Sequence, residues 1–272
     1  MIKLIATDLD GTLMSPDHLT ISQRTIDALQ QAHNKGIKIA IATGRPMAII
    51  DDVVKQIPFV DYIIYSNGAC VFDRNLNCNT YENLIDNSTA RDIIEYFVQY
   101  PVFFEVYING KSHYQFGTED YFVAQDMPQE FLDSIISSMI GHDNILDAVG
   151  SSDVEKVTLY SVKSELAEKF TQMLCCHNLS VASSFTDNIE TTSSTANKGE
   201  AINGICKSLG ITADDTMTFG DAGNDCDMLR FAKYSFAMGN ATDECKAAAK
   251  FVTLSNAQDG LAVAVEKYAL GI

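Results

Sequence analysis

The sequence contains no tryptophan, no long apolar run and few basic residues. Because no stretch approaches eighteen consecutive apolar residues, we expect no transmembrane helix. The opening segment, MIKLIATDLD, becomes acidic too early for a signal peptide, so we expect no secretion signal. Nineteen lysine and arginine residues stand against thirty-six aspartate and glutamate residues, which gives a net charge of −17. Such a surface repels nucleic acids and anionic membranes, and neither is an expected partner.

Cysteine motifs that bind metals or exchange disulfides are also missing. The chain has seven cysteines, but it contains no Cys-x-x-Cys pair, and the only close neighbours are Cys175 and Cys176. Together with the lack of a secretion signal, this cysteine usage indicates a reduced, cytoplasmic protein. An anionic ligand of so acidic a protein must be bound by local positive charge, a metal ion or backbone amides.

Two sequence patterns divide the 272 residues, which suffice for one large domain or two modest ones at roughly 150 residues per domain. Over residues 1–82 and 187–272, continuous apolar runs such as Ile37–Thr43 alternate with amphipathic stretches. This pattern is typical of a parallel sheet covered by helices on both faces. Over residues 83–186, segments such as Val102–Ile108 alternate polar and apolar residues, which suits a sheet with one solvated face. The sequence therefore predicts a Rossmann-like, doubly wound α/β core with an inserted α+β domain.

The strongest local motif is D-x-D-G-T at residues 8–12, directly after an apolar strand predicted at Ile2–Thr7. Residues two apart on an extended segment point the same way, so the carboxylates of Asp8 and Asp10 face one space beyond the strand. Ligands of open α/β sheets bind at such strand ends. The alternative is an exposed acidic turn in which Gly11 supplies positive φ, but the apolar strand before the motif disfavours it.

A second acidic motif, G-D-A-G-N-D at residues 220–225, follows a strand predicted at Thr216–Phe219. Asp221 lies at the strand end, and Asp225 lies in the first turn of the next helix. With the two acids of the first motif, four carboxylates converge on one edge of the sheet. A hard divalent ion such as Mg²⁺ relieves their repulsion. A preference for the helix N-terminus would explain Asp225 alone but not the whole set.

Two further sequence features indicate phosphate binding, weakly when each is taken alone and more strongly in combination. Thr43 and Gly44 precede a helix expected from about Pro46, where a hydroxyl and backbone amides form an anion site. Lys198 begins a helix, where its charge opposes the helix dipole, and among carboxylates it would stay protonated and bind phosphate. Ordinary capping and a solvated surface lysine are the alternatives. Combined with the acids, these residues indicate phosphoryl transfer through an aspartyl-phosphate.

In this order, the motifs resemble those of the haloacid dehalogenase (HAD) superfamily of phosphatases over nearly the whole chain. Finer similarities to the Cof-type branch lie at residues 66–69, 197–199, 239–241 and 259–260. The resemblance implies that the insert at 83–186 is a C2-type cap, which determines substrate specificity.

The resemblance also implies roles for individual residues. Asp8 is the implied nucleophile and Asp10 the implied general acid/base. The implied Mg²⁺ ligands are the side chains of Asp8 and Asp221 and the backbone carbonyl of Asp10, with Asp225 supporting them from outside the ligand set. The implied phosphate-binding groups are the Leu9 amide, Thr43, Gly44, Lys198 and Asn224.

The implied activity is hydrolysis of small phosphorylated metabolites. Sugar phosphates come first, with pyridoxal phosphate and flavin-pathway phosphates as alternatives. A phosphomutase would need the cap to exclude water, and a phospho-accepting signalling module would be about half this length. A catalytically dead sugar-phosphate-binding protein is disfavoured because every motif residue is present. We expect a monomer or weak homodimer. Candidate substrate contacts around a hairpin of the insert are Tyr107, Asn109, Lys111, His113 and Tyr114.

Overall fold

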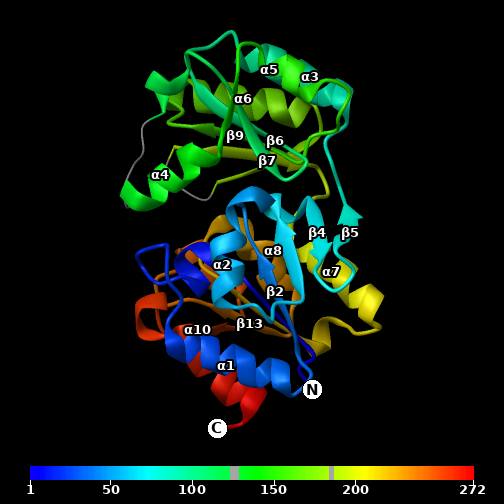
Figure 1. Ribbon diagram of the computed structural model, residues 1–272, viewed down its shortest axis with the longest axis vertical. Helices are drawn as coiled ribbons and strands as arrows, with labels where there is room; N and C mark the ends of the chain where they lie inside the picture. Colours follow the sequence, from blue (N-terminus) through cyan, green and yellow to red (C-terminus); the bar gives the residue numbers. More distant parts are fainter. Residues whose placement is uncertain (123–128, 184–186) are drawn as a thin grey trace. The chain divides into compact units, whose positions relative to one another are not determined.

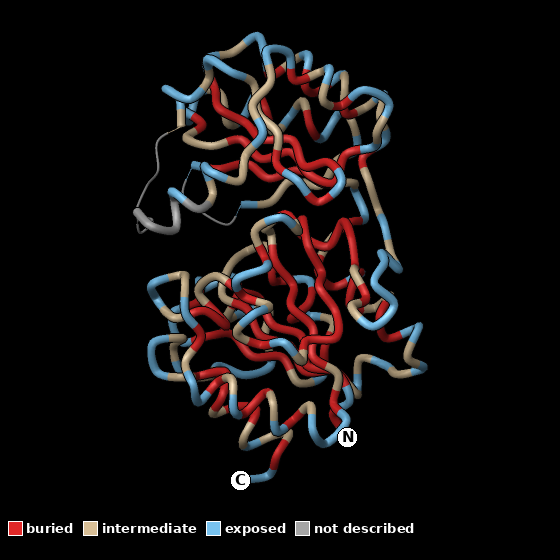
Figure 2. Tube along the Cα trace, viewed as in Figure 1, coloured by how far each residue is buried: buried red, intermediate tan, exposed pale blue. Residues whose placement is uncertain are grey.

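The computed structural model describes residues 1–122, 129–183 and 187–272, which form two compact units (Figure 1). The first unit comprises Met1–Gly44, Ile50–Glu82 and Asn197–Ile272, and the second comprises Arg45–Ile49 and Asn83–Ala196. Buried strands lie at the centre of each unit (Figure 2). Within the described part of the chain, no helix has the length and apolar character needed to cross a membrane.

An eight-stranded sheet forms the centre of the first unit. Its strands are β1 (Leu4–Thr7), β2 (Lys38–Ala42), β3 (Tyr62–Tyr65), β4 (Cys70–Asp73), β5 (Cys78–Glu82), β12 (Thr216–Gly220), β13 (Tyr234–Ala237) and β14 (Phe251–Val252). The spatial order is β14-β13-β12-β1-β2-β3-β4-β5, parallel from β14 to β3 and antiparallel from β3 to β5. Every residue of β1, β3 and β12 is buried, as their continuous apolar runs predict.

Helices cover this sheet and complete a Rossmann-like α/β core. They are α1 (Gln23–Asn34), α2 (Asp51–Gln56), α7 (Lys198–Leu209), α8 (Cys226–Phe231), α9 (Asp243–Ala248) and α10 (Gly260–Val265). Helix α1 begins after Ser22, whose hydroxyl accepts a hydrogen bond from the Thr25 amide at 3.2 Å. Helix α1 packs on α10, and α7 packs on α8.

The order of the strands reverses between β1 and β12. The chain runs from β1 to β2 and β3 on one side, and later from β12 to β13 and β14 on the other. Strands β1 and β12 pair in register, with Thr7 opposite Phe219. The Asp8 amide donates to the Phe219 carbonyl at 3.0 Å. Ligands of open α/β sheets bind outside the carboxyl ends of the strands at such a reversal. The two acidic motifs therefore emerge side by side at this position.

The second unit has a six-stranded sheet in the order β10-β11-β9-β6-β7-β8. The strands are β6 (Phe103–Ile108), β7 (Lys111–Gln115), β8 (Ile140–His142), β9 (Lys156–Tyr160), β10 (Leu179–Ala182) and β11 (Ile189–Ser193), and the helices are α3 (Asn87–Phe97), α4 (Gln129–Ser138), α5 (Ile145–Val149) and α6 (Ser164–Cys176). The predicted alternation of polarity along β6 is present, but the predicted solvated face is wrong, because all six residues are buried. The buried polar side chains bond to one another instead: the Tyr107 hydroxyl donates to Glu105 at 2.7 Å.

The second unit extends beyond the insert that the sequence indicates. Residue 186, its expected end, lies outside the described residues. Strand β11 follows that position, yet it pairs antiparallel with β9 and β10 and so belongs to the sheet of the insert. The short segment Arg45–Ile49 also belongs to this unit. There the Ala48 amide donates to the Gly110 carbonyl at 2.8 Å, and a Cβ on Gly110 would lie 2.8 Å from the Met47 Cβ.

Candidate active site

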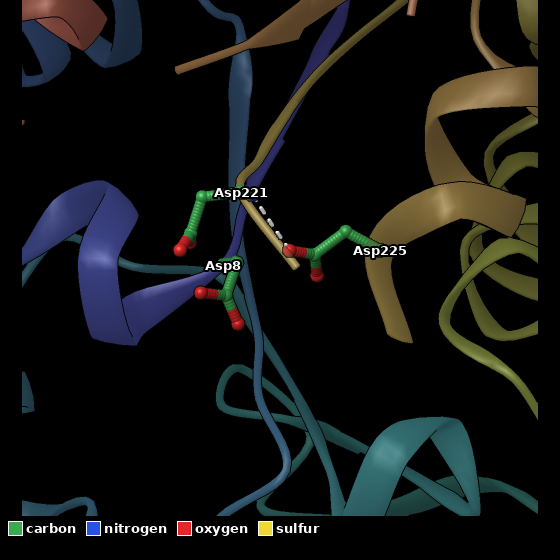
Figure 3. Close-up of side chains that lie close together, drawn as sticks. All are labelled: Asp8, Asp221 and Asp225. Carbon is green, nitrogen blue, oxygen red and sulfur yellow. Dashed lines mark hydrogen bonds between the residues drawn. The ribbon is translucent and has the colours of Figure 1, made fainter. Parts of the chain in front are cut away.

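Three carboxylates meet at the edge of the sheet where the strand order reverses (Figure 3). Asp8 follows β1, Asp221 follows β12 and Asp225 precedes α8. One oxygen from each lies within 4.8 Å of the other two. Asp10, the fourth acid of the predicted cluster, is near enough for its charge to raise the pKa of Asp8 and of Asp221. Its carboxylate, however, contacts His18, with 2.9 Å between Oδ1 and the imidazole Nδ1.

Lys198 is fully buried between two of these acids. Its Nζ lies 2.6 Å from Oδ1 of Asp8 and 2.6 Å from Oδ1 of Asp225. The start of α7 reaches this place because Gly68, at φ +90°, has no side chain: a Cβ there would lie 2.3 Å from the Asn197 carbonyl oxygen. A solvated surface lysine, the alternative for this position, is therefore wrong.

Asp225 is bound entirely by the protein itself. Its Oδ1 accepts from Lys198, and its Oδ2 accepts from the Ala222 amide at 3.0 Å. The same Oδ2 accepts from the Asp221 amide at 2.8 Å (Figure 3). By contrast, Oδ2 of Asp8 and Oδ2 of Asp221 have no hydrogen-bond partner among the described residues. The geometry thus separates a supporting acid, Asp225, from two acids with an oxygen available to a ligand.

The environment disfavours the charged forms of the acids. Burial raises the pKa of Asp8 well above its usual value, and the charge of Asp225 adds to this effect while Lys198 opposes it. Burial and the charge of Asp225 raise the pKa of Asp221 to about 7, although the Thr12 hydroxyl donates to it at 2.7 Å. Burial lowers the pKa of Lys198, but the charges of Asp225 and Asp8 outweigh burial and raise it overall.

A divalent cation fits this imbalance. The single positive charge of Lys198 does not neutralise the negative charges of the clustered carboxylates. The two available oxygens, Oδ2 of Asp8 and of Asp221, are hard carboxylate donors of the kind that Mg²⁺ prefers. A Cβ on Gly11 would lie 2.3 Å from Oδ2 of Asp221, so the glycine of the first motif leaves that oxygen room. Asp8 and Asp221 are therefore the side chains suited to hold the ion.

The predicted phosphate-binding residues lie on neighbouring loops of the same unit. Thr43 is buried at the end of β2, and its carbonyl accepts from the Asn67 amide at 3.0 Å. The side-chain amide of Asn224 donates to the side-chain oxygen of Asn67 at 3.2 Å. Asn67 therefore connects the loop after β2 with the loop after β12. Leu9 buries its side chain completely. The structure thus places Thr43, Asn224 and Leu9 on loops that adjoin the carboxylates.

One argument for Thr43 and Gly44 was wrong. The helix expected from Pro46 begins only at Asp51, and Met47–Ile49 forms a single 3₁₀ turn. The Ala48 amide donates to the carbonyl of Gly110 in the second unit. The hydroxyl of Thr43 and the amide of Gly44 stay candidates on their own, without the help of a helix N-terminus.

Three residues at the site were not assigned a role from the sequence: Thr12, Asn67 and His18. Thr12 belongs to D-x-D-G-T, and Asn67 belongs to the Ser-Asn-Gly-Ala motif, so each carried a signal that could have identified it. His18 lies eight positions after Asp10 in no motif, and only folding brings it to the carboxylate.

The variant Lys198→Met tests the electrostatic role of the buried lysine. It leaves Asp8 and Asp225 buried without a cation, and loss of one partner from a buried ion pair costs about 3–5 kcal/mol of unfolding free energy. Denaturant unfolding at pH 8 measures this loss. Lys207→Met, on the exposed face of the same helix, serves as the matched control and should change stability little. Equal stability of the two variants would contradict the role.

An enzyme that transfers phosphoryl groups is the class that this fold and site define. Residues 5–265 match the family model of haloacid dehalogenase-like hydrolases, and the chain belongs to this family. Phosphatase YwpJ of Bacillus subtilis (strain 168) is 30% identical over 282 residues, covering 96% of this chain and 98% of that protein. The 5-amino-6-(5-phospho-D-ribitylamino)uracil phosphatase YcsE of the same organism is 26% identical over 270 residues, covering 99% and 96%.

Solved structures agree with this assignment. The HAD subclass IIB sugar phosphatase BT4131 matches with a TM-score of 0.85 at 27% identity, covering 98% of this chain and 99% of that one. A haloacid dehalogenase-like hydrolase from B. subtilis also matches with a TM-score of 0.85, at 25% identity, covering 98% and 100%. The predicted fold class, the HAD family and the phosphatase class of enzyme are thereby confirmed.

Proposed function

We propose that the protein hydrolyses small phosphorylated metabolites in a Mg²⁺-dependent reaction through an aspartyl-phosphate on Asp8. The observation that carries this proposal is the buried Lys198, which lies 2.6 Å from both Asp8 and Asp225 beside an acid with an available oxygen, Asp221. The Asp8 and Asp221 side chains, with the Asp10 carbonyl, would hold the ion. When bound, Mg²⁺ neutralises charge on the phosphate dianion and on the attacking carboxylate.

The Asp8 carboxylate is the proposed nucleophile. Lys198 bonds to its Oδ1 at 2.6 Å and so keeps the group oriented as it attacks phosphorus. The bond from phosphorus to the ester oxygen breaks as the new bond forms, and Asp10 gives its proton to the departing oxygen. Asp10 then takes a proton from water, which attacks the phosphorus of the aspartyl-phosphate and releases inorganic phosphate.

Five groups would bind the phosphate while Asp8 reacts with it. Lys198 supplies the positive charge, and the Thr43 hydroxyl, the Asn224 amide and the backbone amides of Leu9 and Gly44 supply hydrogen bonds. Asp225 keeps the lysine ammonium in place, because it accepts from Lys198 on one oxygen and from two backbone amides on the other.

Sugar phosphates are the substrates that we propose first, with the insert selecting the organic group. BT4131, at 27% identity, is a sugar phosphatase, and the insert of this chain offers polar groups that suit hydroxyls. Glu105 accepts from Tyr107 and Tyr160, while its Oε1 and the Thr158 hydroxyl are buried without a hydrogen-bond partner in the described chain. Buried polar atoms need hydrogen-bond partners, so this polar face has a capacity for hydrogen bonds that the described residues do not use.

The candidate contacts of the hairpin fall into two groups. Tyr107 and Tyr114 lie on the polar face with Glu105, because Tyr107 pairs with Ser112 and Tyr114 packs on Phe103. His113 lies on the other face and is bonded to His142, with 2.9 Å between the imidazole nitrogens. We therefore retain the two tyrosines and not His113 as candidates, while Asn109 and Lys111 stay predictions. A flavin-pathway phosphate stays the second candidate substrate, since YcsE acts on one.

A screen of phosphorylated metabolites tests the proposal. Purified protein is incubated with Mg²⁺ and sugar phosphates, pyridoxal phosphate or ribitylaminouracil phosphate, and released inorganic phosphate is measured. Continuous release with a preference for sugar phosphates supports the proposal. Stoichiometric labelling without turnover would indicate a phospho-accepting module, and transfer between hydroxyls without phosphate release would indicate a mutase.

Asp10→Asn is expected to lower turnover by about 10²–10⁴-fold, the usual worth of general acid/base catalysis. With p-nitrophenyl phosphate, whose leaving group needs no proton, the first step should survive. Because hydrolysis of the intermediate still needs the base, phosphate should be trapped on Asp8 after one burst. Rapid quenching and mass spectrometry of the Asp8 peptide measure the adduct. A folded variant with neither burst nor adduct would contradict this role.

A further inference from the structure

The loop after the first acidic motif brings a histidine to the proposed general acid. His18 lies on the segment between Leu13 and α1, and its Nδ1 is 2.9 Å from Oδ1 of Asp10. The two side chains are 24% and 22% exposed, so the contact is shielded from most of the solvent. Neither the family motifs nor the phosphate-binding set includes this residue.

The backbone of the loop is built to hold His18 in an unusual conformation. Its φ is +58°, in the left-handed region that is uncommon for residues other than glycine, although asparagine, aspartate and histidine adopt it more often than the rest. The His18 amide donates to the Ser15 carbonyl at 2.9 Å, and the Ser15 amide donates to the Thr20 carbonyl at 2.8 Å. The Asp17 carboxylate accepts from the Thr20 amide at 2.9 Å and from its hydroxyl at 2.6 Å. These bonds close the loop around the histidine.

A side chain from α2 anchors the same loop to the core. Gln56 donates to the Leu19 carbonyl at 2.9 Å and accepts from the Ile21 amide at 2.9 Å. Non-glycine residues in the left-handed region persist only when their surroundings fix them, and such residues cluster at functional sites. The hydrogen bonds on both sides of His18 fix its backbone, and its side chain points to Asp10.

We propose that His18 is a positioning residue for Asp10, an inference that rests on the proposed function. By engaging Oδ1, the imidazole fixes the orientation of the carboxyl group that transfers the proton. A neutral imidazole can donate from Nδ1 to the carboxylate or, in its other tautomer, accept from the carboxyl. The contact can therefore persist in both protonation states of Asp10, the carboxylate and the carboxylic acid. An ammonium group could not do this, because it donates hydrogen bonds but cannot accept them.

Two variants separate the side chain from its backbone. His18→Gly removes the imidazole but tolerates positive φ, and His18→Asn also tolerates it while restoring a donor and an acceptor near Nδ1. For each we compare kcat/KM for an alkyl phosphate and for p-nitrophenyl phosphate, because this quantity reports the steps up to departure of the leaving group. The melting temperature of each variant verifies that the loop still folds.

We expect His18→Gly to lower kcat/KM for the alkyl phosphate by about tenfold or more, since small misplacements of catalytic groups cost up to about 10²-fold. The value for p-nitrophenyl phosphate should change little, and His18→Asn should recover much of the loss. Equal losses with both substrates, no loss in His18→Gly, or no recovery in His18→Asn would each overturn the proposal.

Asp10→Asn in the same assay distinguishes this inference from the proposed function. If Asp10→Asn discriminates between the two substrates and His18→Gly does not, only the role of His18 is overturned. If Asp10→Asn loses activity equally with both, the acid role of Asp10 fails, and the role of His18 fails with it.

Discussion

Asp8→Asn is expected to abolish phosphatase turnover while leaving the melting temperature unchanged or higher. The amide keeps the shape of the side chain and can still accept from Lys198, but it lacks the charge of a nucleophile. Burial and Asp225 already disfavour a charged Asp8, so its neutralisation relieves repulsion within the cluster. Lys198 keeps its second partner, Asp225. Phosphate release under saturating substrate measures the activity, and calorimetry measures the melting temperature.

A matched substitution on the surface controls for the chemistry of the change. Asp27→Asn alters an exposed carboxylate of α1 in the same unit and should retain full activity. Retention of more than a few per cent of wild-type kcat by Asp8→Asn, with deamidation excluded by mass spectrometry, would show that Asp8 is not the nucleophile.

Removal of divalent ions is expected to abolish turnover, and added Mg²⁺ is expected to restore it. Asp221→Ala should raise the Mg²⁺ concentration needed for this recovery, because the variant loses one of the two carboxylates with an available oxygen. The measurement is phosphate release after chelation and titration with MgCl₂, with Asp27→Asn as the control. Undiminished hydrolysis in excess chelator would contradict the assignment of the cation site.

The Mg²⁺ requirement should also depend on pH. The pKa of Asp221 in the metal-free protein is about 7, so below that value a proton competes with the ion for the carboxylate. The half-saturating Mg²⁺ concentration should rise as pH falls from 8 to 6, approaching about tenfold per unit for one displaced proton. The unfolding free energy of the metal-free protein depends on pH in the opposite direction from the Mg²⁺ affinity. Because folding raises the pKa of Asp221, this residue stabilises the fold fully below pH 4, and the stabilisation is lost as pH rises through 7.

The sequence predicted the parallel strands and the acids at their ends because these signals are local. The strands predicted at Ile2–Thr7 and Thr216–Phe219 are present as β1 and β12, although β1 begins at Leu4 and β12 extends to Gly220. Apolar runs report burial directly, and the end of a strand fixes where the next polar side chains lie. The meeting of Asp8 and Asp221 follows from these local facts and from the order of the strands.

Other features depend on contacts between distant residues, which no local pattern reports. Lysine is a residue type that usually lies at the surface. Lys198 is buried nevertheless, because two acids from other loops form ion pairs with it. The polar face of β6 is buried because its polar groups bond to one another, whereas alternation alone indicates solvent. His18 meets Asp10 through a loop whose shape is set by Asp17 and Gln56.

The segment Arg45–Ile49 limits how freely the insert can be exchanged between relatives. A graft of Asn83–Ala196 would transfer the second unit without this segment, which the chain supplies directly after Gly44. The transferred hairpin would then meet a foreign residue at position 47, beside Gly110, where a Cβ added to the glycine would lie 2.8 Å from the Cβ of Met47. Recombination that replaces the large insert must therefore carry two separate pieces of coding sequence, and the shorter piece adjoins the proposed phosphate-binding loop. A new substrate preference acquired by transplantation would put that loop at risk, whereas point substitutions within the insert would leave it intact.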